Sequence, residues 1–434
     1  MNARDGFPAT GKPVRAEAGV KNIAKACAAT LILSSSLGSI PGRAQQINSV
    51  KQQVTLSPEI QTALSLERQG QYPEAQAAWK AVVHAQPRNG QAYAHLGLLE
   101  ARQDHYPEAI SYYRKAQALD PAIPQLSFNL ALALFKSSNF REAAKIFEAE
   151  LRRHPKSPDA PRMTILAGMA HYGGHEYGAA ISYLKEAAAA DPKNLQLQLT
   201  LAHCYLWTKQ LDATMATYRQ ILLIDPDSAE ADMIAGEALD EEGDNAGAVR
   251  EFRAAALANP KETNVHFGLA YLLWTQKQYD EAITEFKAEL ANDPKNNQAM
   301  IYLGDTYIQL DKFDQGRAVL EQADGFQTSN PLIHLDLGIA YMETGDKDGA
   351  IREFNRTVLL EPDNVTAHFR LATLYRTMGK KDQANAEFAK ANTLNRKHDD
   401  SLHKRIADAN AHADTDAKPA EPQMPGAAAK PDQP

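Results

Sequence analysis

The feature that most constrains the fold of this chain is a proline that returns at a nearly fixed interval. Eight prolines each follow a polar residue, and neighbours lie 34 residues apart, apart from one step of 37 and a last step of 68. They are Pro87, Pro121, Pro155, Pro192, Pro226, Pro260, Pro294 and Pro362. Because a proline has no backbone N–H and restricts the residue before it, each of them ends a helix. A period of this size is typical of solenoids.

Other residue types follow the same interval. One series, from Ala63 to Ala372, contains Gly or Ala at every step. Another series, from Trp79 to Phe388, contains a large apolar or aromatic residue at every step. Small residues let two helices approach closely, and a large side chain from the second helix fills the space beside them. The pattern therefore predicts that each repeat is a helix hairpin with a small residue packed against a large one.

The order of these positions resembles the tetratricopeptide repeat family. The second repeat, "QAYAHLGLLEARQDHYPEAISYYRKAQALDP", has the family's positions in order, and the seventh repeat is as close. In the second repeat they are Leu96, Gly97, Tyr106, Ala109, Tyr113, Ala116 and Pro121. The resemblance implies an all-α fold, an α-solenoid of ten helix-turn-helix repeats over residues 56–396 that forms a right-handed superhelix. The fourth and eighth repeats depart from the pattern, so we expect irregular helix ends there.

Residues 1–44 have the composition of a signal peptide. A basic lead precedes the apolar run Ala26–Ile40, which is too short to span a bilayer, and small residues stand at Gly42 and Ala44. We expect cleavage near Ala44 and an exported protein of bacterial type, periplasmic or extracellular. The alternatives are a mitochondrial-type presequence and a start codon placed too early.

The remaining flanks differ from the repeats. Residues 45–55 are expected to form a short N-terminal lead. Residues 397–411 are predicted to form a separate capping helix, with Asp400 or Ser401 as its N-cap and an apolar stripe facing inward. Residues 412–434 are rich in Ala, Pro, Asp and Lys and lack apolar residues for a core, so we expect a disordered tail.

Charge and cysteine content restrict the class of partner. The formal net charge is −8, and the signal segment holds more basic than acidic residues, so the mature chain is more acidic still. This balance disfavours general affinity for nucleic acid or for an anionic membrane, and no long apolar run follows the signal segment. Loss of Cys27 with the signal segment would leave Cys204, which therefore cannot form an intramolecular disulfide and is expected to be a buried small residue.

In the resembled family, the first helices of the hairpins line a concave groove that binds partners. The positions on these helices that lie away from the packing columns are our candidate partner-binding residues. They are Leu132, Met169, His203, Trp207, Glu237, Asp240, Glu241, Tyr271, Trp274 and Asp305. An aromatic and aliphatic floor with an acidic segment suits a peptide that has apolar anchors and a basic residue. The alternative for the flanking apolar residues is packing against the neighbouring repeat.

The function that the resemblance implies is that of a non-enzymatic scaffold or adaptor of the cell envelope, which binds a protein or peptide in the groove. We expect no catalytic residue, no cofactor, no metal, no bound nucleic acid and no membrane span. One alternative is a structural solenoid that associates with its own copies as a homo-oligomer. A second alternative is a metal-dependent enzyme at His171 and His175, which lie four residues apart, although Gly173 and Gly174 interrupt the helix between them.

Overall fold

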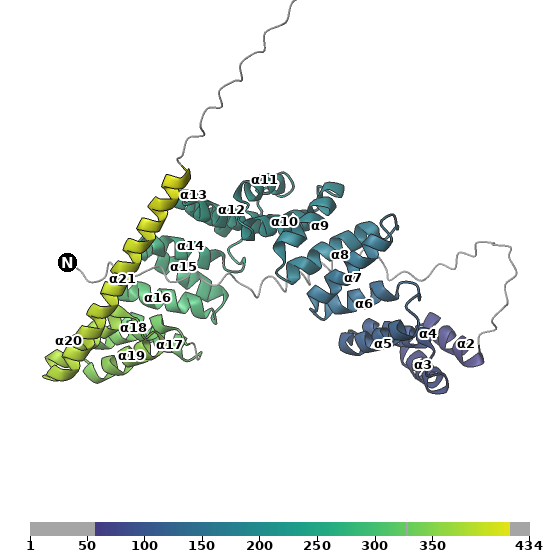
Figure 1. Ribbon diagram of the computed structural model, residues 1–434, viewed down its shortest axis with the longest axis horizontal. Coiled ribbons are helices and arrows are strands. Elements are labelled where there is room, and N and C mark those ends of the chain that lie inside the picture. Colours follow the sequence, from purple (N-terminus) through teal and green to yellow (C-terminus); the bar gives the residue numbers. More distant parts are fainter. Residues whose placement is uncertain (1–56, 327–328, 417–434) are drawn as a thin grey trace, which may run out of the picture. The chain divides into compact units, whose positions relative to one another are not determined.

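The computed structural model describes residues 57–326 and 329–416, and the chain divides into two compact units. Unit 1 ends at Gly268 and unit 2 begins at Leu269. The described residues form twenty helices, α2 to α21, and no strand (Figure 1). The predicted all-α solenoid of helix-turn-helix repeats is thus confirmed. The predicted signal peptide and the N-terminal lead lie outside the described residues.

Unit 1 is built from six hairpins, in each of which an even-numbered helix packs against the odd-numbered helix that follows. Its helices are α2 (Pro58–Arg68), α3 (Tyr72–Ala85), α4 (Gly90–Arg102), α5 (Tyr106–Leu119), α6 (Leu126–Lys136), α7 (Phe140–Arg153), α8 (Ala160–Gly173), α9 (Tyr177–Ala190), α10 (Leu195–Trp207), α11 (Leu211–Leu222), α12 (Ala229–Glu242) and α13 (Asn245–Ala258). The division between the units falls within α14 (Val265–Thr275).

Unit 2 continues the alternation of even-numbered and odd-numbered helices. Its helices after α14 are α15 (Tyr279–Asn292), α16 (Asn297–Gln309), α17 (Phe313–Asp324), α18 (Pro331–Glu343), α19 (Lys347–Leu360), α20 (Val365–Thr377) and α21 (Lys381–Asp416). None of the helices in the described part of the chain combines the length and apolar character that crossing a bilayer requires.

Within a hairpin, the small residue of the even-numbered helix lies directly against the large residue of the odd-numbered helix. A Cβ atom added to Gly97 would lie 2.6 Å from the ring of Tyr113, and one added to Gly338 would lie 2.6 Å from the ring of Phe354. Both rings are fully buried. A contact this close excludes any larger residue unless the ring moves. The packing that the period predicted is therefore present.

The turn between the two helices of each hairpin contains one residue with a left-handed backbone. These residues again follow the repeat interval, and only four of the ten are glycines. They are Gly70, Asp104, Ser138, His175, Lys209, Gly243, Lys277, Asp311, Gly345 and Gly379. The left-handed conformation favours glycine because other residues place Cβ too close to the carbonyl oxygen. Six turns therefore hold a non-glycine residue in a conformation that costs free energy.

Asparagines begin several even-numbered helices. Asn89, Asn194, Asn296 and Asn364 each stand two residues after a proline of the periodic series. Each accepts a hydrogen bond from the backbone N–H three residues later, at 2.9 to 3.2 Å. This is the usual N-cap, which satisfies one of the free N–H groups of the first turn. Proline and asparagine together thus end one hairpin and start the next.

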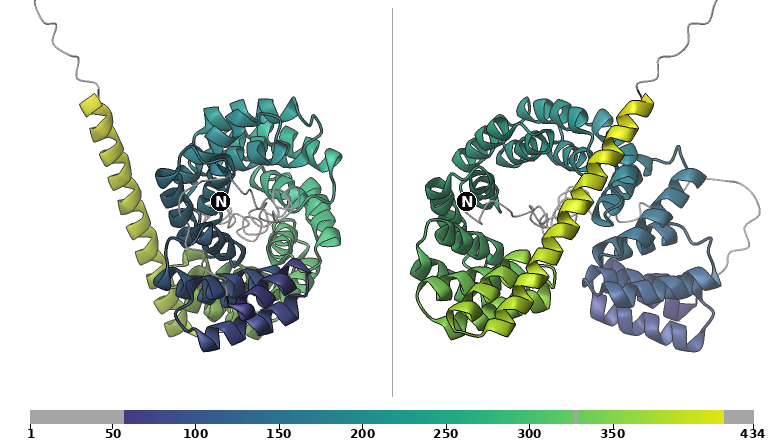
Figure 2. Two further views of the ribbon diagram at one scale, coloured as in Figure 1. Left: turned by 90° about the vertical axis from the view of Figure 1, so that its right-hand side faces the viewer. Right: turned by 60° about the vertical axis from the view of Figure 1, so that its left-hand side comes forward.

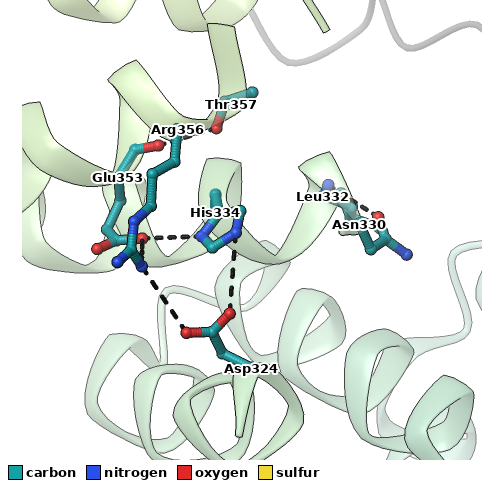
Figure 3. Close-up of polar contacts among 7 residues, drawn as sticks. All are labelled: Asp324, Asn330, Leu332, His334, Glu353, Arg356 and Thr357. Atoms are coloured by element: carbon teal, nitrogen blue, oxygen red, sulfur yellow. Dashed lines mark hydrogen bonds and ion pairs between the residues drawn. The ribbon is translucent and has the colours of Figure 1, made fainter. Parts of the chain in front are cut away.

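Buried polar side chains connect the helices of unit 2. His334 of α18 lies between two carboxylates, with Nδ1 2.9 Å from Glu353 of α19 and Nε2 3.8 Å from Asp324 of α17 (Figure 3). Arg356 approaches both carboxylates from the same helix as Glu353. Burial on its own would raise the pKa of Glu353, but the hydrogen bond with His334 and the charge of Arg356 lower it below its usual value. The network therefore holds Glu353 in its ionised form.

The C-terminal end differs from the prediction of a separate capping helix at residues 397–411. Those residues continue α21, which runs unbroken from Lys381 to Asp416 and extends well past α20, its packing partner (Figure 2). The reason is that the proline position of the repeat is occupied by Arg396, so nothing ends the helix there. The first residues of the predicted tail, 412–416, are also helical, and residues 417–434 lie outside the described residues.

Candidate functional site

The central predicted residues occupy the same position on successive even-numbered helices, but their exposure differs. In unit 1, Leu132 and Glu237 are half-buried, whereas Met169 has no exposed surface. In unit 2, Tyr271 is half-buried and Asp305 is 2% exposed. Met169 and Asp305 therefore do not line a surface in this structure, because each is covered by the helices packed around it. The other predicted residues remain candidates for contact with a partner.

The apolar residues that flank these positions are mostly buried. They include Phe135, Tyr172, Leu199, Leu206, Ile301, Ile308 and Leu335, each of which is at most 5% exposed. Packing within the core, the alternative weighed from the sequence, thus describes them better than contact with a ligand.

An aromatic cluster lies around Trp207 at the end of α10. The ring of His203 stacks on Trp207 with a centroid distance of 5.1 Å, and the ring of Tyr177 lies 4.6 Å from it. Tyr172 of α8 stacks on the indole at 5.7 Å. His203 and Trp207 stand one helical turn apart, so their side chains share a face of α10. Three consecutive helices of unit 1 thus place aromatic rings together, and the indole remains partly exposed.

Beside this cluster is Glu230, in the first turn of α12. Its Oε1 lies 3.7 Å from Nδ1 of His203, which is too long for a hydrogen bond. Burial, together with the charge of Glu262, raises the pKa of Glu230 to about 7. Burial also lowers the pKa of His203 to about 4. At neutral pH the imidazole is therefore neutral and the carboxyl group is close to its titration midpoint.

The predicted acidic residues of unit 1 lie on α12, at positions equivalent to those of the aromatic cluster on α10. Glu237 corresponds to His203, and Glu241 corresponds to Trp207, one period earlier. Helices α10 and α12 are in contact, so the two sets of positions are neighbours on consecutive repeats. Lys209 approaches Glu241 at 3.3 Å from the end of α10. Asp240 is also half-buried on this face.

Unit 2 contains a second aromatic cluster, formed by Tyr271 and Trp274 of α14 with Tyr302 of α16. The ring centroids lie 5.1 to 5.9 Å apart. The indole N–H of Trp274 donates a hydrogen bond to Asp305 at 2.5 Å, and Gln309 donates another at 3.1 Å. Trp274 therefore has a structural role in joining α14 to α16, whatever else it contacts.

A second carboxyl group, Asp336 of α18, is buried beside Asp305. Burial raises the pKa of Asp336 well above its usual value, and the neighbouring Asp305 raises it further. Burial raises the pKa of Asp305 as well, against the hydrogen bonds that it accepts from Gln309 and Trp274. Two adjacent carboxyl groups in a buried site cannot both ionise readily, so we infer that they share a proton. Asp336 was not predicted from the sequence, because it stands at a different repeat position from Asp305 and corresponds to Tyr302 of the preceding repeat.

The residues of the metal-site alternative do not share a helix face. Helix α8 ends at Gly173, and His175 lies in the following turn with φ of 61° and its Nδ1 2.6 Å from the hydroxyl of Tyr177. His171 is buried, and its two ring nitrogens lie 2.8 and 2.9 Å from Glu176 and Glu148. Within residues 57–326 and 329–416, no group of three or more His, Cys, Asp or Glu side chains is placed to hold a metal ion.

The free thiol of unit 1 is enclosed by the core. Cys204 has no exposed surface, and burial raises the pKa of its thiol. A protonated and covered thiol is a poor nucleophile, so the side chain acts as a small apolar residue in the core.

Helix hairpins of similar length, each closed by a small-on-large contact and stacked in succession, define an α-solenoid, a class of fold whose members generally serve as non-enzymatic scaffolds. A profile described as "Tetratricopeptide repeat" matches residues 60–124, 128–194, 235–297 and 335–396, together more than half of the chain. A related profile with the same description matches residues 173–237 and 273–328. The chain belongs to the tetratricopeptide repeat family, whose members bind protein or peptide partners.

Each match to a related protein covers only part of this chain and part of the relative. The chain is 31% identical over 155 residues to Peroxisome biogenesis protein 5 of Arabidopsis thaliana, a match that covers 36% of this chain and 20% of that protein. It is 26% identical over 180 residues to the Peroxisomal targeting signal receptor of Komagataella phaffii, which covers 39% of this chain and 30% of that protein. The chain therefore spans less than a third of the length of these two relatives.

One similar solved structure is YrrB, described as a TPR protein with an unusual peptide-binding site. It is 17% identical, the TM-score is 0.37, and the match covers 46% of this chain and 98% of YrrB.

Proposed function

We propose that the chain is an exported scaffold or adaptor of a bacterial cell envelope, without enzymatic activity, that binds a peptide or protein segment on the surface of its even-numbered helices. The bound segment would have apolar anchors and a basic residue. The signal-like composition of residues 1–44 supports export, with cleavage near Ala44.

The observation that carries the proposed binding role is the surface formed by α10 and α12 in unit 1. We call it the aromatic–acidic surface, and define it by His203, Trp207, Glu237, Asp240 and Glu241. Aromatic side chains supply large contact area at low cost in conformational entropy and are enriched among binding hot spots. Carboxylates beside them favour a basic residue on the partner. The relative from Komagataella phaffii is named a Peroxisomal targeting signal receptor, which agrees with a peptide ligand.

A pair of charge reversals tests this role. The chain is used to capture partners from a bacterial envelope extract, and the affinity of a purified captured protein is then measured. Glu237→Lys with Asp240→Lys should weaken that affinity at least tenfold, because two attractive carboxylates become repulsive charges. The matched control is Glu108→Lys with Asp212→Lys, which makes the same change in net charge at exposed positions of the odd-numbered helices α5 and α11.

Thermal unfolding of both double variants is recorded beside the affinities. Equal weakening by both variants would show that only overall charge matters, and an unchanged affinity of the first variant would place the binding surface elsewhere. Light scattering at several concentrations distinguishes a foreign partner from a second copy of the chain. N-terminal sequencing of the protein from the envelope fraction tests export, for which the expected first residue is Gln45.

A further inference from the structure

Three polar side-chain atoms lie buried together beside the aromatic–acidic surface without a hydrogen-bond partner among the described residues. They are Nδ1 of His203, Nε1 of Trp207 and Oε1 of Glu230. Buried polar atoms in folded proteins nearly always have partners, since an unsatisfied one has lost its water without gaining a replacement. Three of them on two neighbouring helices indicate a place where a partner from outside the chain completes the hydrogen bonding.

The distance between two of these atoms limits the kind of group that fits. Nδ1 of His203 and Oε1 of Glu230 are 3.7 Å apart. Neutral His203 with its proton on Nε2 presents Nδ1 as an acceptor, and an ionised Glu230 is an acceptor as well. A nitrogen placed between them can lie about 2.9 Å from each, and it must donate to both. An ammonium group, with three N–H donors, meets this requirement.

The surroundings favour a positive charge at the same place. The indole of Trp207 packs against His203, Tyr172 and Tyr177 but stays partly exposed, so its uncovered part can contact the alkyl stem of a basic side chain. Glu262, in the loop between α13 and α14, adds a carboxylate that acts on Glu230. The indole N–H is then left to donate to a carbonyl group of the ligand backbone.

We propose that His203, Trp207 and Glu230 form a lysine subsite, in which the ammonium group of a bound peptide lies between His203 and Glu230 and its stem contacts the exposed part of Trp207. The inference rests on the proposed function and names the side chain that the surface recognises. The two side chains reach solvent in part, since 32% of the Glu230 side chain and 14% of the His203 side chain are exposed. Because the facing atoms themselves are buried, the Glu230 carboxylate has to rotate to admit the ammonium group.

The subsite makes lysine binding depend on pH with a defined sign. Only ionised Glu230 attracts the ammonium group. With a pKa of about 7, Glu230 is ionised in about one molecule in ten at pH 6 and in about nine in ten at pH 8. His203, with a pKa of about 4, is neutral throughout this range, and lysine is charged throughout it. Binding should therefore be about tenfold tighter at pH 8 than at pH 6.

The experiment uses ¹⁹F NMR of the full chain with 5-fluorotryptophan. The chain has three tryptophans, Trp79, Trp207 and Trp274, so three signals are assigned by Trp→Phe variants. The indole N–H groups of Trp79 and Trp274 are already bonded to Glu67 and Asp305. The probes are acetyl-Leu-Lys-Leu-amide and the same tripeptide with norleucine in place of lysine, which has a similar stem but no charge.

We expect the lysine probe to shift the Trp207 signal, with an affinity that rises about tenfold from pH 6 to pH 8, and the norleucine probe to bind at least tenfold more weakly. Glu230→Gln should weaken lysine binding about tenfold at pH 8 and remove its pH dependence. The matched control is Glu242→Gln, an exposed residue at the end of the same helix, which should behave as the parent.

The lysine subsite would be overturned if both probes shifted the Trp207 signal equally, or if the pH dependence survived Glu230→Gln. Equal shifts are the result expected of a site filled only by water. The proposed function is tested separately by the charge reversals at Glu237 and Asp240. If those reversals abolish partner binding while Glu230→Gln does not alter it, the subsite is wrong and the binding surface stands. If neither change affects partner binding, both proposals fail.

Discussion

Replacement of Asp336 by Asn should make unit 2 more stable, by an amount that grows with pH. Asp336 and Asp305 are 1% and 2% exposed, and burial raises the pKa of both carboxyl groups. An unfolded chain releases the proton of Asp near pH 4, whereas the folded pair retains it. The folded state then binds one proton more than the unfolded state, so its stability falls as pH rises above 4.

The magnitude follows from the number of protons. One proton retained on folding corresponds to about 1.4 kcal/mol of lost stability for each pH unit over which the pair stays protonated. In Asp336→Asn, the amide N–H can donate to Asp305, and the proton that Asp336 retains on folding is absent, so the slope should decrease by the contribution of that proton. The variant should therefore gain about 1.4 kcal/mol on the parent for each such unit.

Hydrogen exchange measured by mass spectrometry provides a local assay, with peptides that cover α16 (Asn297–Gln309) and α18 (Pro331–Glu343). The opening free energies of variant and parent are compared at the same pH, so the intrinsic effect of pH on exchange cancels. Asp382→Asn, an exposed carboxylate in the first turn of α21, is the control and should leave the slope unchanged. A constant difference between Asp336→Asn and the parent across pH 5 to 7 would refute a shared proton.

Changes at three further positions test the packing within a repeat, the strain in a turn and a buried ion pair. Phe354→Ala removes a fully buried ring that fills the space beside Gly338, and should lower the free energy of unfolding by about 3–5 kcal/mol in thermal or urea unfolding. Phe354→Leu should lower it by less than about 1.5 kcal/mol, because leucine occupies the equivalent positions 184 and 320. Ser138→Gly should raise stability by up to about 1 kcal/mol, because Ser138 has φ of 65°, and Ser138→Val should lower it; a stabilising Val would contradict the argument from backbone strain. Because the pKa of Glu353 is lowered in the folded state, its pair with His334 stabilises the fold above about pH 4 and ceases to do so as pH falls. In acid unfolding, Glu353→Gln should therefore lose less stability than the parent between pH 5 and pH 3.

The hairpins could be predicted from the sequence because their cause is local and repeats ten times. A proline ends a helix wherever it occurs, and a Gly or Ala position 16 residues before a large residue can be recognised by counting. The same rule explains why a helix boundary before residue 397 was predicted incorrectly. Arg396 takes the place of the proline, and α21 therefore continues through residues 397–411 instead of ending before them.

The candidate site was less predictable because exposure depends on how neighbouring repeats pack. Met169 and His203 occupy equivalent positions one repeat apart, yet Met169 is fully buried and His203 keeps 14% of its side chain exposed. The local sequence around each position does not predict this difference in exposure. Glu230 was missed for a related reason, since it stands in the first turn of α12 and meets His203 only through the contact of α10 with α12.

Site-specific photo-crosslinking shows whether a bound partner lies on the even-numbered helices. A photoreactive phenylalanine analogue is placed at Asp240 of α12 in one sample and at Asp212 of α11 in another, and each is irradiated with the purified captured partner. We expect a crosslinked product from position 240 and none from position 212. A product from position 212 with none from position 240 would contradict a binding surface on the even-numbered helices.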